Sequence, residues 1–222
     1  EELFNDRTLS LVSVLLLEGI YFYNFTTPEF NVNVSQLPFW ALSVYFFWKG
    51  LNINKTKDWI LFGVFSALGF LSKYLFLYIL VALFIFLIFN LEKYKKSIKN
   101  YFLSIIISLA LLTPHFIWLI DNNFVTIFYG LDRSGVSDFN FINHIKNPVI
   151  FLIKQSIILV PFFIMIFVII KKFNFKINIK DKKTLFLLSI NLIPITLMLI
   201  TSIFTGANIR TMWMTPFYLF LG

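Results

Sequence analysis

The chain has 222 residues, of which 59% are hydrophobic and 30 are Phe, and its formal net charge is +8. This apolar fraction exceeds the roughly 45–50% of an average soluble domain, which indicates a polytopic membrane protein, and the absence of Cys excludes disulfides and thiolate metal or redox sites. Because the basic residues fall in short clusters between apolar runs, we expect membrane lipids rather than nucleic acid as partners.

Long apolar runs divide the chain. Runs of about 17–25 residues are typical of helices that span a bilayer. They predict seven spanning helices, near residues 9–25, 35–48, 59–72, 74–91, 101–120, 149–170 and 184–204. The second and third runs are short, so their helices should recruit flanking residues or thin the bilayer locally. The sequence therefore predicts an all-α, polytopic membrane helical bundle that forms a single transmembrane domain over residues 1–222.

The distribution of lysine predicts the orientation. Lysines concentrate in three connections, 49–57, 93–99 and 171–183, which the positive-inside rule makes cytoplasmic. The connections at 26–34, at 72–74, at 121–147 and after residue 204 are poor in Lys and Arg, and strict alternation places all of them outside. The abundance of Phe, Ile, Lys and Asn, which have A/T-rich codons, favours a bacterial source. For a polytopic membrane protein from a bacterium we expect the inner (cytoplasmic) membrane.

Lys73 stands between two apolar runs that otherwise carry no charge. With Tyr74 it should lie at the outer end of a tight helical turn. A cation there is costly unless it reaches water or an anionic partner, which makes it a candidate for a functional site. The alternative is that the side chain merely extends to the outer headgroups.

The outer connection 121–147 alternates aromatic and polar residues and includes Asp121, Asp132, Arg133, Asp138 and His144. Such a pattern is typical of a segment that lies partly in the membrane interface. Connections this long are also more often functional than idle.

Several motifs resemble the family 39 and family 83 membrane glycosyltransferases, which include protein O-mannosyltransferase-like proteins and the aminoarabinose transferase of lipid A. The matching stretches, in order, are Phe30–Asn33 with Pro38–Trp40, Leu68–Tyr74, Thr113–Trp118 with Asp121–Val125, and Lys154–Gln155 leading to Pro161.

The resemblance implies a GT-C architecture with its active site at the outer face. It implies a polyprenyl-phosphate-linked sugar as donor, no cofactor, inversion of configuration, and a lipid, glycan or protein as acceptor. Two departures matter. The expected catalytic carboxylate lies upstream of the matched region, and a new apolar run begins at residues 218–222, so we expect the chain to be truncated at both ends. Asn33 also stands where many relatives carry an Asp, and an amide cannot act as a base.

Donor binding is assigned to Lys73, Tyr74 and Arg210, because cations stabilise the charge that develops on a leaving phosphate and Arg offers a bidentate fork. Arg210 could instead be held by lipid headgroups, with Trp213 in the aromatic belt. The catalytic residue is unknown. Glu29 is a weak candidate, being the only carboxylate in the connection 26–34.

Substrate-binding roles are predicted for Asn31, Asn33, His115, Asp121 and Arg133. If the segment around Asn31 and Asn33 is extended, both amides point to one side and can face a sugar. The alternative is that they form hydrogen bonds with nearby backbone, as Asn often does in turns. His115 follows Pro114, which would kink or end a helix, so the imidazole could cap broken backbone instead of binding substrate. A lone His without Cys argues against a metal site.

Two other functions stay open. A transporter or flippase of lipid-linked sugars, without catalytic activity, would also need outer cations and a groove for the prenyl chain. A structural membrane subunit would need neither. Fold resemblance alone does not decide among them.

Overall fold

The computed structural model describes residues 3, 6–25, 27, 29–136, 140–170 and 181–222, and within these residues the chain forms helices and no strand. Two compact units emerge. The terminal unit comprises Glu1–Val34 and Phe139–Gly222, and the central unit comprises Ser35–Asp138. The predicted all-α membrane helical bundle is confirmed.

Helical segments occur at all seven predicted positions. Three are long and apolar enough to cross a membrane: Leu91–Asp121, Asn143–Ile169 and Lys182–Thr205. Helices α4 (Leu37–Ile53) and α5 (Thr56–Ser72) have 17 residues each. The apolar segment Tyr74–Phe89 is also shorter than a full span.

The prediction of one continuous helix over residues 9–25 is wrong. The chain forms α1 (Arg7–Leu17) and α2 (Tyr21–Asn24), with a break at residues 18–20. At the break, Gly19 packs closely against α10 (Asn143–Ile170): a Cβ there would lie 2.8 Å from the Cα atom of Phe162, so only glycine permits this approach. The side chain of Asn24 donates to the backbone carbonyl of Glu18. This bond satisfies one of the backbone groups that have no partner within a helix at the break.

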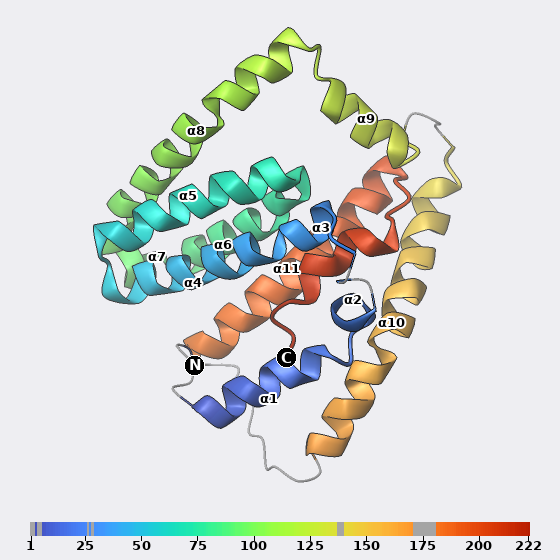
Figure 1. Cartoon of the computed structure of the whole chain (residues 1–222), viewed down its shortest axis with the longest axis horizontal. Coiled ribbons are helices and arrows are strands. Elements are labelled where there is room, and N and C mark those ends of the chain that lie inside the picture. The colour runs from blue at the N-terminus through green and yellow to red at the C-terminus, as the bar shows by residue number, and fades with distance from the viewer. Residues whose placement is uncertain (1–2, 4–5, 26, 28, 137–139, 171–180) are drawn as a thin grey trace. The chain divides into compact units, whose positions relative to one another are not determined.

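In the central unit, α5 packs against both α4 and α8 (Ile98–Asp121). Between α4 and α8 the chain also forms η1 (Tyr74–Phe76), α6 (Leu77–Phe89), α7 (Leu91–Tyr94) and η2 (Lys95–Ser97), and α9 (Val125–Arg133) follows α8. Figure 1 shows α4, α5 and α6 alongside one another and a sharp turn of the chain between α8 and α9.

Small and aromatic side chains hold the central unit together. A Cβ on Gly63 would lie 2.6 Å from the carbonyl oxygen of Ser104, so glycine lets α5 approach α8 closely, as small residues do between membrane helices. Ser108 donates to the carbonyl of Gly63 across the same contact, over 2.7 Å. Nearby, the Tyr101 ring contacts the rings of Trp59 and Phe62 at 5.9 and 6.3 Å.

The central unit has two distinct ends. At the first, which we call the lysine end, the connection from α4 to α5 meets the connection from α6 to α8, because Asn54 donates to the carbonyl of Lys96 over 3.3 Å. At the second, the ring of Phe76 in η1 contacts the ring of Trp40 near the start of α4 at 5.9 Å. Consequently α5 and α8 run in one direction and α4 and α6 in the other. Lys73 lies at the second end, between α5 and η1.

In the terminal unit, α10 packs against α1 and α11 (Lys182–Thr205), and η3 (Thr211–Tyr218) contacts α2, α10 and α11. The short helix α3 (Val32–Ser35) ends on the first residue of the central unit. Gly206 ends α11 with a φ of 68°, a conformation that favours glycine, and its carbonyl accepts a 2.7 Å bond from Asn147. The hydroxyl of Tyr218 donates to the buried Gln155 over 2.7 Å.

Candidate functional site at the Lys73 turn

A tight turn places Lys73 at the end of the central unit. Helix α5 stops at Ser72, and Lys73 is extended, with φ −169° and ψ 135°. Gly69 makes the turn possible, because a Cβ there would overlap the ring of Phe76, which is fully buried. The buried ring therefore anchors η1 against α5 and fixes where Lys73 and Tyr74 emerge.

The hydroxyl of Tyr74 joins three elements. It lies 2.8 Å from Nε2 of His115 in α8 and 2.7 Å from Oγ1 of Thr126 in α9. A phenol has one proton and two lone pairs, so it can serve both partners at once, and the direction of each bond depends on the tautomer of His115. The Lys73 turn, α8 and α9 thus meet at one hydrogen-bonded centre.

Aromatic rings surround this centre. His115 stacks on Trp118 with ring centroids 5.9 Å apart, and Phe70 packs against Tyr74 at 5.1 Å. Helix α8 continues through Pro114 to Asp121, so the proline does not end the helix. His115 bonds to Tyr74, a partner that the sequence did not suggest.

The charge of Lys73 is the electrostatic feature of the site. The side chain is half-buried. Burial, and next the positive charge of Arg133 in α9, lower the pKa of Lys73 from its ordinary value of 10.5 to about 7. Because Arg133 acts on Lys73 through its charge, two cations share one region of the central unit. Such a pair is complementary to an anion, which would relieve both the desolvation and the repulsion.

Arg133 is held by its own helix. It donates to the hydroxyl of Tyr129 one turn earlier and lies over that ring, 5.7 Å from the centroid. None of the α9 residues is fully buried, so most of the helix is accessible.

The other predicted site residues lie elsewhere. Asp121, the last residue of α8, is exposed. In the terminal unit, Oδ1 of Asn31 accepts from the backbone N–H of Asn33 over 2.8 Å and so starts α3. The extended geometry considered for these two amides is therefore not found, and Asn33 is buried. Glu29 is exposed, and its backbone carbonyl accepts from the side chain of Asn31.

Arg210 also belongs to the terminal unit, where it is exposed and directly precedes η3. Lys73 and Arg133 both belong to the central unit, and the pairing of Lys73 with Arg210 stays a prediction. Asp138 and most of the third lysine-rich connection, 171–180, lie outside the described residues.

Sequence reasoning missed Thr126. It lies between a motif that ends at Val125 and a run of aromatics, and nothing in its neighbours marks it. Only the fold of α9 against the Lys73 turn gives it a role.

These observations describe an all-α membrane protein in which Lys73 directly precedes a hydrogen-bonded group of hydroxyl and imidazole side chains at one end of the central helices. A family model of dolichyl-phosphate-mannose-protein mannosyltransferases matches residues 1–118. The match covers more than half of the 222 residues, and the chain belongs to this family of membrane glycosyltransferases. Neither a curated protein nor a solved structure matches the chain.

The family match confirms the resemblance to membrane glycosyltransferases. The matched region includes Lys73, Tyr74 and His115, whereas Thr126 and Arg133 follow it. The site therefore combines a segment within the family match and a helix beyond it.

Proposed function

We propose that this chain binds the phosphate of a polyprenyl-phosphate-linked sugar at the Lys73 turn and takes part in transferring that sugar. The acceptor is a lipid, glycan or protein at the outer face of the membrane. The observation that carries the proposal is the position of half-buried Lys73 directly before Tyr74, whose hydroxyl lies at hydrogen-bond distance from His115 and Thr126. Family membership supplies the reaction type, and this site supplies a place for the donor.

The chemistry requires positive charge at the leaving group. When the bond between the sugar and the phosphate breaks, a phosphodiester with one negative charge becomes a monoester, which carries about −1.5 to −2 at neutral pH. Two cations stabilise this developing charge more than they stabilise the donor, and such a difference accelerates the reaction. Lys73 and Arg133 supply this charge in the proposed mechanism, and the Tyr74 hydroxyl positions the phosphate or donates to it.

The remaining assignments follow from the sequence. We propose that Arg210 gives a further contact to the donor phosphate, and that the segment 121–147 covers the acceptor. Asn31, Asn33 and Asp121 are candidates for contacts with sugar hydroxyls. The group that accepts the acceptor's proton is unassigned, with Glu29 the candidate in the described residues of the connection 26–34.

A transfer assay with the full-length protein in membranes tests the proposal. We expect Lys73→Ala to abolish transfer from a polyprenyl-phosphate sugar, and Arg133→Gln to reduce it strongly. The matched control is Lys182→Ala, which removes a half-buried lysine at the start of α11 in the terminal unit. All three variants should reach the membrane in normal amounts.

Unchanged turnover in Lys73→Ala would remove Lys73 from the mechanism. Movement of lipid-linked sugar across vesicles by the unmodified protein, without transfer to any acceptor, would instead support a transporter.

A further inference from the structure

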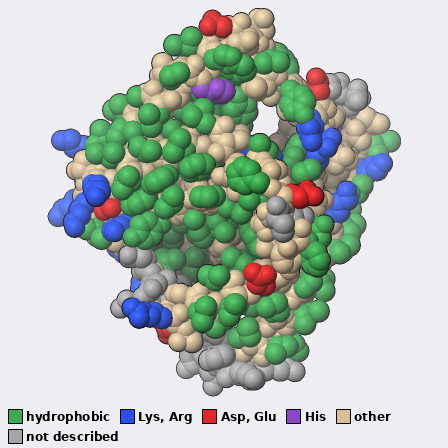
Figure 2. Space-filling view, viewed as in Figure 1, with side chains coloured by type: hydrophobic (Ala, Val, Ile, Leu, Met, Phe, Trp, Pro, Cys, Tyr) green, Lys and Arg blue, Asp and Glu red, His purple; other side chains and the backbone are tan. Residues whose placement is uncertain are grey.

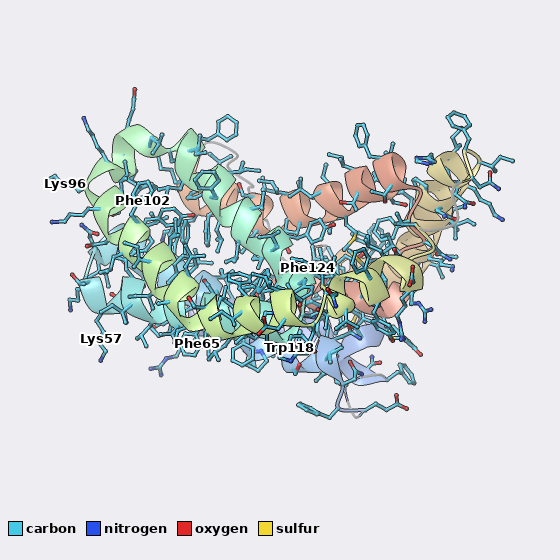
Figure 3. The ribbon with its side chains drawn as sticks, turned by 90° about the horizontal axis from the view of Figure 1, so that it is seen from above. Lys57, Phe65, Lys96, Phe102, Trp118 and Phe124 are labelled. Atoms are coloured by element: carbon cyan, nitrogen blue, oxygen red, sulfur yellow. The ribbon has the colours of Figure 1, made fainter. Side chains whose placement is uncertain are left out.

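The lysine end of the central unit carries a second concentration of positive charge. Six exposed lysines occupy two connections that are about forty residues apart in the sequence: Lys55, Lys57, Lys93, Lys95, Lys96 and Lys99. Figure 3 shows Lys57 and Lys96 at this end, away from Trp118 and Phe124. In Figure 2, Lys and Arg side chains gather at the same edge of the molecule.

Asn54 joins the two connections into one surface. It ends α4 with a left-handed φ of 55°. Its side chain donates to the carbonyl of Lys96 over 3.3 Å and accepts from Trp59 over 3.2 Å and from Asn100 over 3.1 Å. A single amide therefore fixes the start of α5, the start of α8 and the lysine-rich turn between them. The lysines are held together by the fold, although their order in the sequence separates them.

Acidic neighbours do not neutralise this surface. Asp58, in the first turn of α5, is buried, and one of its carboxylate oxygens has no hydrogen-bond partner. Glu92 is the exposed acid among residues 92–99. Among residues 55–58 and 92–99, six exposed lysines therefore accompany one exposed acid, which leaves an excess of positive charge.

Apolar side chains border the lysines. Ile53, the last residue of α4, is 48% exposed, and Phe89, the last residue of α6, is 84% exposed. Phe102, one turn into α8, is also exposed. Ammonium groups above exposed hydrocarbon match a phospholipid, which offers a phosphate next to acyl chains, better than they match a soluble anion.

We infer that the lysine end of the central unit is a binding surface for the headgroups of anionic phospholipids. Both connections contribute ammonium groups to it, and Asn54 sets their spacing. This surface is separate from the Lys73 site, since the two lie at opposite ends of the central unit, and its test does not depend on sugar transfer.

Thermal unfolding of the purified protein in a neutral detergent tests this inference. Short-chain phosphatidylglycerol should raise the melting temperature by several degrees more than short-chain phosphatidylcholine, because a ligand that binds only the folded state stabilises it. The double variants Lys55→Gln/Lys57→Gln and Lys95→Gln/Lys96→Gln should each lose most of this difference. The control Lys146→Gln/Lys154→Gln removes two exposed lysines of α10 and should keep it.

Asn100→Ala separates a built surface from simple net charge. It keeps every lysine but removes the bond to Asn54, so the preference for phosphatidylglycerol should fall. Equal stabilisation by the two lipids, or an equal loss in the Lys146/Lys154 control, would overturn the inference. Inorganic phosphate that stabilises the protein as well as phosphatidylglycerol would overturn the assignment to a lipid.

Discussion

Donor binding should depend on pH through Lys73. Burial and the charge of Arg133 lower its pKa to about 7, so the side chain is half protonated at neutral pH. If only the charged form binds phosphate, the apparent Kd increases as the protonated fraction falls, about tenfold between pH 6 and pH 8 and about a hundredfold by pH 9. A sugar phosphodiester keeps one negative charge throughout this range, so the dependence belongs to the protein.

Lys73→Arg isolates this effect. A guanidinium has a pKa above about 12 and stays charged at every pH tested, so the variant should bind the donor with an affinity that changes little between pH 6 and pH 9. The measurement is the Kd of a short-chain polyprenyl-phosphate sugar, titrated into the purified protein at four pH values.

Two results would refute the reasoning. A flat profile in the unmodified protein would mean that the charge of Lys73 is not needed for binding. A profile that is equally steep in Lys73→Arg would assign the pH dependence to a group other than Lys73.

Three further predictions concern the structure of the site. Gly69→Ala should lower the free energy of unfolding by roughly 1–3 kcal/mol, because the added methyl group overlaps a buried ring. The control Gly130→Ala, in open space within α9, should be neutral or stabilise the protein by up to about 1 kcal/mol. Chemical denaturation of both variants in detergent gives the comparison. Thr126→Val removes one hydrogen bond to Tyr74 and should cost about 0.5–1.5 kcal/mol, while Thr126→Ser should retain donor affinity in the same titration. The folded-state pKa of Lys73 lies below 10.5, so the unfolded chain binds more protons between pH 7 and pH 10.5, and the free energy of unfolding should rise over about this range. The rise should be smaller in Lys73→Met, as measured by unfolding at several pH values.

Composition and hydrophobic runs predicted most of the fold. Uncharged apolar stretches have few alternatives to a helix in a membrane, so helices form where the runs lie. The pattern failed at residues 9–25, because periodicity does not report that Gly19 packs against the backbone of α10. The distribution of lysine predicted that the connections 49–57 and 93–99 lie on the same side of the membrane. The structure places both at one end of the central unit, opposite Lys73.

The candidate site was predictable in part. Lys73 stands out because a charge between apolar runs is rare, and His115 because the chain has only two histidines. Asn31 and Asn33 were ambiguous, since an amide can face a ligand or bond to nearby backbone with equal ease, and here the backbone of α3 takes Oδ1 of Asn31. Local sequence patterns are compatible with both contact to a ligand and a hydrogen bond to nearby backbone, so they did not distinguish the two.

The contribution of α9 could not be predicted, for a reason that lies in two backbone angles. After α8 ends, Asn123 and Phe124 adopt φ values of 52° and 55°, and this pair of left-handed residues redirects the chain so that Thr126 reaches Tyr74. Asn accepts that conformation readily, but an aromatic residue seldom does, so Phe124 carries no sequence signal for a turn. The cost must be met by contacts that the turn creates, among them the 2.8 Å bond from the Phe124 N–H to the carbonyl of Leu119 and the Tyr74–Thr126 bond. The two left-handed residues therefore determine whether α9 contacts the Lys73 turn, and neither hydropathy nor residue spacing reports such a pair.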